Sequence, residues 1–107
     1  MEFQQLVNRA MSIRQQYAKK EQALCGSPWN TEEIALGFVG DVGDLAKLVM
    51  AENGRRDIPR AREKLGHELA DCMWSVIVLA CLHGIDLEST FITTMDELED
   101  RLAEIED

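Results

Sequence analysis

The sequence is poor in residues that interrupt helices and in patterns that build sheets. Proline occurs only at Pro28 and Pro59, and no segment alternates apolar and polar residues in the manner of a strand. Apolar residues instead recur at spacings of three and four, which is typical of amphipathic helices. We therefore expect an all-α protein, and 107 residues favour a single domain over positions 1–107.

Histidine and cysteine are also scarce. With two histidines and no Cys-x-x-Cys pair, the chain lacks the usual zinc ligand sets. The stretch "HELAD" begins like the zinc-protease motif H-E-x-x-H, but Asp71 stands where the second histidine belongs. Three cysteines, two of them in an apolar run, indicate reduced thiols. Because no basic segment followed by an apolar stretch opens the chain, we expect a cytoplasmic protein.

Positive charge is the third shortage. The chain has 11 Lys and Arg against 20 Asp and Glu, which gives a net charge of -9. This balance argues against nucleic acid and anionic membranes as partners, since both require clustered cations. The longest uncharged run, residues 72–85, has 14 residues, fewer than the roughly 20 that span a bilayer. A phosphate ligand would need a bridging divalent cation.

The hydrophobic periodicity predicts four helices, over residues 2–24, 31–52, 60–82 and 87–105. Asn30 and Glu33 have the spacing of a capping box at the start of the second helix. Asp86 is a suitable N-cap for the fourth. Short connections between long helices favour a four-helix bundle.

The third helix is apolar on almost every side after Asp71. A helix with this pattern is normally buried on every side, which one small bundle does not provide. We therefore expect the bundle to be completed by a second copy, as a homodimer or a dimer of dimers.

Two pairs of carboxylates lie on the two most apolar helices. Asp41 and Asp44 are three residues apart, as are Glu68 and Asp71, so each pair shares one helix face. Burying an unpaired carboxylate is costly, and proteins usually pair it with a cation. Four oxygen ligands suit Mg²⁺ or Mn²⁺ better than zinc. The alternative is an ordinary solvated acidic face, because acidic residues are abundant here.

These motifs carry a resemblance to a known family. "GDVGDLAKLV" and "ELADCMWSVIVLACLHGIDLESTF" resemble the MazG-like group of all-α nucleoside triphosphate pyrophosphohydrolases, which carry E-x-x-E and later E-x-x-D. Here the pairs are Asp41/Asp44 and Glu68/Asp71, with 23 residues between them. The resemblance covers residues 31–91.

The resemblance implies a MazG-like bundle and a magnesium-dependent enzyme. Asp41, Asp44, Glu68 and Asp71 would bind the metal and carry the catalysis. A nucleoside triphosphate would be cleaved at the α-phosphorus to the monophosphate and pyrophosphate, in the service of nucleotide-pool house-cleaning. A phosphoribosyl-ATP pyrophosphohydrolase is an alternative within the superfamily. The other is a non-catalytic helical interaction module, because aspartates replace both glutamates of the first motif and Gly40 stands where relatives often have another glutamate.

Phosphate contacts are expected from Lys47 and Lys64, each one helical turn from a motif carboxylate, or from Arg55 and Arg56 in the turn. The alternative for each is a solvated surface cation.

Trp29 and Trp74 are candidates for stacking on a nucleobase, with core packing as the alternative. Glycine disfavours helix, yet Gly40 and Gly43 each precede an aspartate of the first acidic pair. We expect them to allow a close approach of the two helices, so that short aspartates reach the metal.

Overall fold

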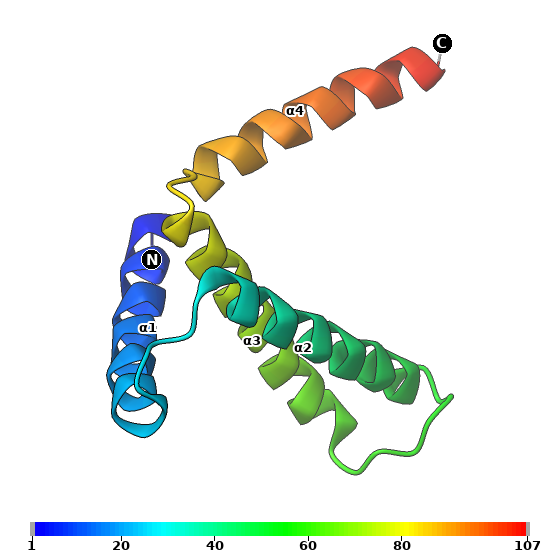
Figure 1. Ribbon diagram of the computed structural model, residues 1–107. Coiled ribbons are helices and arrows are strands. Elements are labelled where there is room, and N and C mark those ends of the chain that lie inside the picture. Colours follow the sequence, from blue (N-terminus) through cyan, green and yellow to red (C-terminus); the bar gives the residue numbers. More distant parts are fainter. Residues whose placement is uncertain (1, 107) are drawn as a thin grey trace.

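The computed structural model describes residues 2–106, and in this range the chain forms four helices and no strand (Figure 1). They are α1 (Phe3–Cys25), α2 (Thr31–Glu52), α3 (Ala61–Leu82) and α4 (Leu87–Glu106). Each begins and ends within one residue of the range expected from the sequence. The all-α prediction is confirmed.

The predicted helix caps are present. The Asn30 side-chain oxygen accepts the Glu33 N–H at 2.8 Å, and Glu33 Oε1 accepts the Asn30 N–H at 3.0 Å. This reciprocal pair satisfies two donors that the first turn of α2 leaves free. Asp86 Oδ1 accepts the Ser89 N–H at 3.1 Å in the same way before α4.

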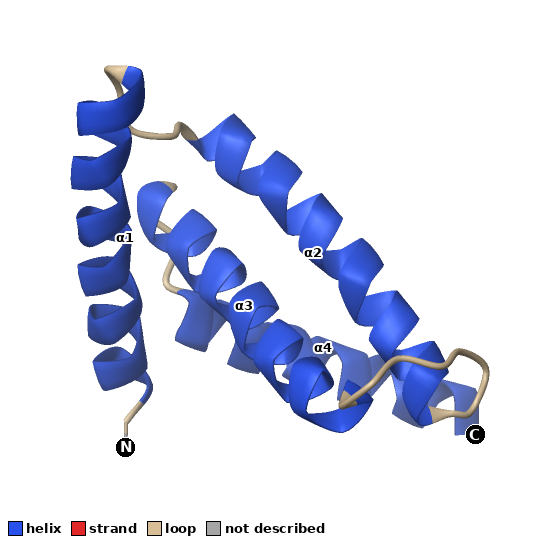
Figure 2. Ribbon diagram, turned by 90° about the horizontal axis from the view of Figure 1, so that it is seen from below, coloured by secondary structure: helices blue, strands red, loops and turns tan. Residues whose placement is uncertain are grey.

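Helices α2 and α3 form an antiparallel hairpin, and α1 lies beside α3 (Figures 1 and 2). The core lies between these three helices. Its buried members come from all three, and α3 supplies most of its volume: Ala10, Ile34, Ile77 and Val78. Val78 is fully buried, so α3 is the helix against which α1 and α2 pack.

Helix α4 projects away from the other three, and its main contact is with α3, near the turn that joins them (Figure 1). Its apolar seam is largely uncovered, with Phe91 59% and Ile105 73% exposed. A single chain therefore forms a three-helix unit with a projecting fourth helix. Periodicity identified the apolar face of α4, but it does not specify what that face packs against.

One helix of the described residues, α3, is long and apolar enough to cross a membrane by length and composition alone. Its most apolar 18-residue window has a mean hydropathy of 1.5 and is 28% buried within the molecule. The uncharged run of residues 72–85 is shorter because it stops at Asp71, whereas this 18-residue window includes both Glu68 and Asp71. Core helices have the same composition, and carboxylates within a bilayer are expensive, so the finding is weak evidence for a membrane span.

The burial of Val78 leads to a stability prediction. Val78→Ala should lower the free energy of unfolding by about 2 kcal/mol, because two buried methyl groups are lost and a cavity remains. Leu24→Ala is the control, since Leu24 is 85% exposed and should change stability by less than about 0.5 kcal/mol. Urea denaturation measures both, and equal losses would contradict this description of the core.

Candidate metal centre and its two grooves

Three carboxylates meet where α2 packs on α3. Asp41 and Asp44 project from α2 and Glu68 from α3, and one oxygen of each lies within 4.8 Å of the others. The helices are antiparallel, so the middle of α2 faces the first half of α3. The sequence prediction that both acidic motifs contribute to one cluster therefore agrees with the geometry of these three residues.

Glu68 is the most constrained member of this acidic cluster. Its Oε1 atom is buried and has no hydrogen-bond partner among the described residues. Burial, and then the negative charges of Asp41, Asp71 and Asp44, raise the pKa of the Glu68 carboxyl above its usual range. A buried acceptor without a partner is costly, and a cation would satisfy it. The all-oxygen donor set therefore fits Mg²⁺ or Mn²⁺.

Asp71 lies beside the cluster and does not join the three grouped oxygens. Its Oδ2 is 3.4 Å from Nε2 of His67, one turn earlier on α3. It is still near enough to contribute to the raised pKa of Glu68. The structure thus groups three of the four expected ligands and places the fourth at their edge.

Cys72 lies one helical turn after Glu68 and is buried. Burial, and then the charge of Glu68, raise the pKa of its thiol. A neutral thiol is a poor ligand for a hard cation, so the cluster remains an oxygen site.

A basic groove of about 810 Å³ opens on one side of the cluster, near the turn between α2 and α3. Asp44 and Glu68 form its acidic end, and both lysines expected from the sequence, Lys47 and Lys64, line it. Arg55 and Arg56 are not among its lining residues.

Two further arginines line this groove and were not identified from the sequence. Arg60 pairs with Glu63 at 2.6 Å, and Arg62 pairs with Glu52 at 2.8 Å. The only signal that points to them is the density of positive charge at the start of α3, which does not say which side chains face the groove.

An aromatic groove of about 710 Å³ opens between α1 and the hairpin, and Asp41 and Asp71 form its acidic end. Trp29 and Trp74 both line it, together with Tyr17, which was not identified from the sequence. The cluster therefore lies where an aromatic groove and a basic groove meet.

The two tryptophans differ in how they are held. Trp74 donates its indole N–H to the Ala10 carbonyl at 3.1 Å and meets the Tyr17 ring edge to face at 5.8 Å. These contacts fix it between α1 and α3. The Trp29 side chain remains half exposed, with 44% of the residue accessible. Trp29 is thus the tryptophan with a free aromatic surface.

The glycine expectation is wrong. A Cβ placed on Gly40 or Gly43 meets nothing within 4 Å, so neither residue allows a close approach of α2 and α3. Gly37 is the helical glycine with a neighbour, since its Cβ would lie 3.4 Å from Cζ3 of Trp29. The spacing of glycines along a helix does not reveal which of them faces another element.

No protein-family model, curated protein or solved structure matches the chain. The resemblance to the MazG-like group accordingly rests on the two acidic motifs and the sequence around them.

The raised pKa of Glu68 makes stability depend on pH. Between the ordinary value of 4.5 and the raised folded value, the folded chain binds more protons than the unfolded chain. Without metal, stability should therefore fall as pH rises through this window. Glu68→Gln removes the buried charge and should raise the melting temperature at neutral pH by a few degrees, given roughly 4–8 °C per kcal/mol.

Glu99→Gln on the exposed surface of α4 is the matched control, and its melting temperature should follow the unmodified protein at every pH. Calorimetry in EDTA from acid to neutral pH measures the difference. A Glu68→Gln variant that is less stable than the unmodified chain at neutral pH would refute this account of Glu68.

Proposed function

We propose that the protein is a magnesium-dependent nucleoside triphosphate pyrophosphohydrolase of the MazG-like kind. The observation that carries the proposal is the acidic cluster, in which oxygens of Asp41, Asp44 and Glu68 lie within 4.8 Å and the buried Glu68 oxygen has no hydrogen-bond partner. The motif resemblance over residues 31–91 supports the same assignment.

The side chains have distinct roles in this proposal. Asp41, Asp44 and Glu68 hold the cation, and Mg²⁺ or Mn²⁺, when bound, neutralises phosphate oxygens and lowers the pKa of water. Asp71 lies at the edge of the cluster, where it completes the ligand set or accepts the proton of the attacking water through its carboxylate oxygens. The water attacks the α-phosphorus, and pyrophosphate leaves.

The two grooves would fix the orientation of the bound substrate. Lys47 and Lys64 in the basic groove would contact the β- and γ-phosphates, because both are cations close to the acidic end of that groove. The free surface of Trp29 in the aromatic groove would stack on the base. Trp74, whose ring packs against Tyr17, would line the same groove without contacting the base. Free nucleoside triphosphates are cytoplasmic, so the proposal places the protein in the cytoplasm.

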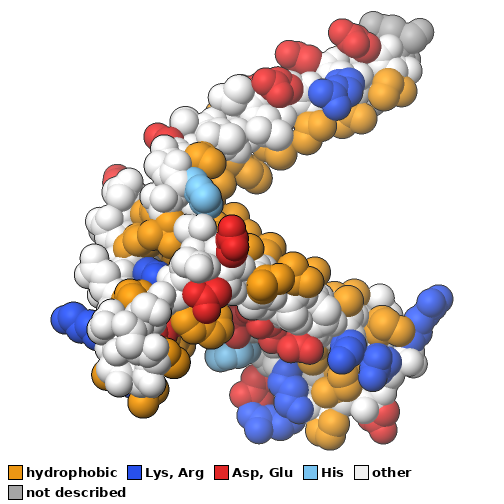
Figure 3. All heavy atoms as spheres, viewed as in Figure 1, with side chains coloured by type: hydrophobic (Ala, Val, Ile, Leu, Met, Phe, Trp, Pro, Cys, Tyr) orange, Lys and Arg blue, Asp and Glu red, His pale blue; other side chains and the backbone are white. Residues whose placement is uncertain are grey.

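We also propose that two copies complete a MazG-like bundle. Hydrophobic side chains gather on the side of α4 that faces the α2–α3 hairpin, and others cover the hairpin itself (Figure 3). Exposed apolar residues on the hairpin include Leu36 at 72%, Val39 at 66% and Leu69 at 52%. Apolar surface of this extent is rare on monomers.

Charge favours the same partner. Residues 87–105 of α4 contain six acidic residues and one arginine, whereas residues 53–64, which comprise the turn and the start of α3, contain five basic residues and two acidic ones. The acidic helix α4, with its apolar seam, therefore complements the apolar hairpin with its basic end. In a dimer, α4 of each copy would pack against the hairpin of the other. A dimer of dimers would extend the same contacts.

The catalytic proposal predicts that Glu68→Gln and Asp71→Asn each lower pyrophosphate release by about 100-fold or more, because each removes a charged oxygen from the cation site. Both variants should remain folded. A panel of ribo- and deoxyribonucleoside triphosphates with Mg²⁺, scored for pyrophosphate, measures the effect. Glu99→Gln should retain full activity.

The same panel separates the enzyme from a non-catalytic module with the same fold. A module would gain melting temperature from Mg²⁺, by the linkage of binding to stability, and release no pyrophosphate from any substrate. Equal melting temperatures with and without Mg²⁺, together with no pyrophosphate release, would refute the metal site as well.

The assembly proposal predicts a dimer or tetramer at micromolar concentration in sedimentation velocity. Leu102→Glu should shift the protein toward monomer, because it places a charge in the apolar seam of α4. Thr93→Glu is the control, because its position is exposed and lies off the seam. A stable monomer of the unmodified chain would overturn this proposal.

A further inference from the structure

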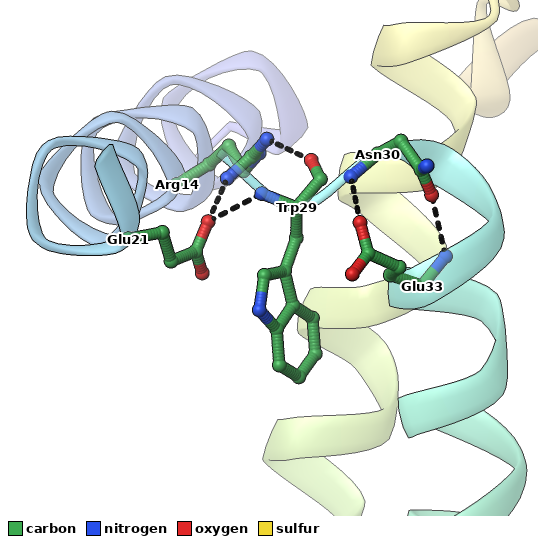
Figure 4. Close-up of polar contacts among 5 residues, drawn as sticks. All are labelled: Arg14, Glu21, Trp29, Asn30 and Glu33. Atoms are coloured by element: carbon green, nitrogen blue, oxygen red, sulfur yellow. Dashed lines mark hydrogen bonds and ion pairs between the residues drawn. The ribbon is translucent and has the colours of Figure 1, made fainter. Parts of the chain in front are cut away.

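Trp29 combines a tightly held backbone with a half-exposed ring (Figure 4). It lies in the short connection between α1 and α2, where backbone groups usually bond to water. Here both its N–H and its carbonyl are bound by side chains of α1.

The two side chains are Arg14 and Glu21. Arg14 donates from Nη2 to the Trp29 carbonyl at 2.6 Å, and Glu21 Oε1 accepts the Trp29 N–H at 2.7 Å. Arg14 Nη1 also donates to the same Glu21 oxygen at 3.2 Å. The three residues thus form a closed ring of hydrogen bonds, which we call the Trp29 clamp (Figure 4).

The clamp is largely removed from water. The Arg14 side chain is 10% exposed and the Glu21 side chain 17%. Burying two charges costs roughly as much as their attraction returns, so such a pair is weak evidence for a gain in stability. What the clamp does fix is the position of one backbone unit, because each charged group bonds to Trp29 as well as to the other.

The next residue is fixed as well. Asn30 and Glu33 form the capping box of α2, so the backbone is held on both sides of the Trp29 side chain. The ring then lies over Gly37, where a Cβ would be 3.4 Å from Cζ3. The indole is therefore attached to a fixed backbone and rests near Gly37, and together with Gly37 it lines the aromatic groove.

We infer that Arg14 and Glu21 are positioning residues for Trp29, which they hold as a rigid wall against which a planar heteroaromatic ring stacks. The inference rests on the proposed function for the identity of that ring as a nucleobase. A fixed wall loses little conformational entropy when the ring binds, which favours affinity. Trp74 does not serve as this wall, because its N–H and ring are already engaged.

The first test needs no catalysis. The chain has two tryptophans, so in a Trp74→Phe background Trp29 is the only indole fluorophore. Nucleoside monophosphates at millimolar concentrations should quench its emission. Glu21→Ala in this background should shift the emission to the red, because the indole is released into water. It should also raise the nucleotide concentration that gives half-maximal quenching about tenfold. Glu21→Gln retains an acceptor for the Trp29 N–H and should restore most of the effect.

The second test uses the enzyme. Trp29→Ala should raise KM for the best nucleoside triphosphate about tenfold, since stacking on one aromatic ring contributes a factor of this order. Glu21→Ala and Arg14→Gln should approach the same value with little change in kcat. Inorganic tripolyphosphate, which lacks a base, should inhibit all variants with the same Ki. Lys19→Ala, exposed on α1, is the matched control and should behave as the unmodified chain.

The outcomes separate this inference from the proposed function. Quenching that is lost in Glu21→Ala and restored in Glu21→Gln supports the clamp even if no triphosphate is hydrolysed. Absence of quenching by every monophosphate overturns it, as does Glu21→Ala with unchanged emission and quenching. An equal rise of KM for the nucleotide and of Ki for tripolyphosphate would also overturn it, because the effect would then be a general disturbance of the site.

Discussion

The packing of α2 against α3 is the contact on which the rest of the molecule depends. It buries Ile34 of α2 in one cluster with Ile77 and Val78 of α3, and it brings Glu68 close to two aspartates. Apolar burial favours this contact, whereas the repulsion among the carboxylates opposes it. The hairpin thus holds its carboxylates together against their mutual repulsion, which raises the pKa of Glu68.

The surroundings of the cluster are asymmetric, and the asymmetry follows from which helix borders each side. Helix α1 covers the end of the hairpin that carries Trp74 and brings Tyr17 with it, which creates an aromatic wall. At the other end the hairpin turns, and the basic residues of the groove lie on α2, at the end of the turn and at the start of α3. A ligand with an aromatic end and a polyanionic end matches this order.

The sequence predicted local features well because they depend on neighbouring residues. Helix ends, the Asn30–Glu33 capping box and the Asp86 cap are determined by residues within one turn, and all three are confirmed. The meeting of the two acidic motifs required only an antiparallel hairpin.

Features that depend on side-chain direction or on distant contacts were not predictable. The rotamer that turns Asp71 toward His67 has no signature in spacing. The Trp29 clamp joins residues eight and fifteen positions apart through an irregular loop, so no periodicity reveals it. The direction of α4 depends on the short turn 83–86, in which Gly84 has a φ of 69°, and on whatever covers the apolar seam of α4. The hydrophobic pattern encodes neither.

The glycines of α2 have a dynamic consequence. Gly37, Gly40 and Gly43 fall within seven residues of one helix, and together they weaken its intrinsic helical preference by roughly 3 kcal/mol relative to alanine. No neighbouring side chain compensates at Gly40 or Gly43. The centre of a helix usually exchanges its amide hydrogens most slowly. In α2 we expect the backbone hydrogen bonds of the centre to open more readily than in a helix without these glycines. Asp41 and Asp44 thus lie in the segment of α2 with the weakest intrinsic preference for helix.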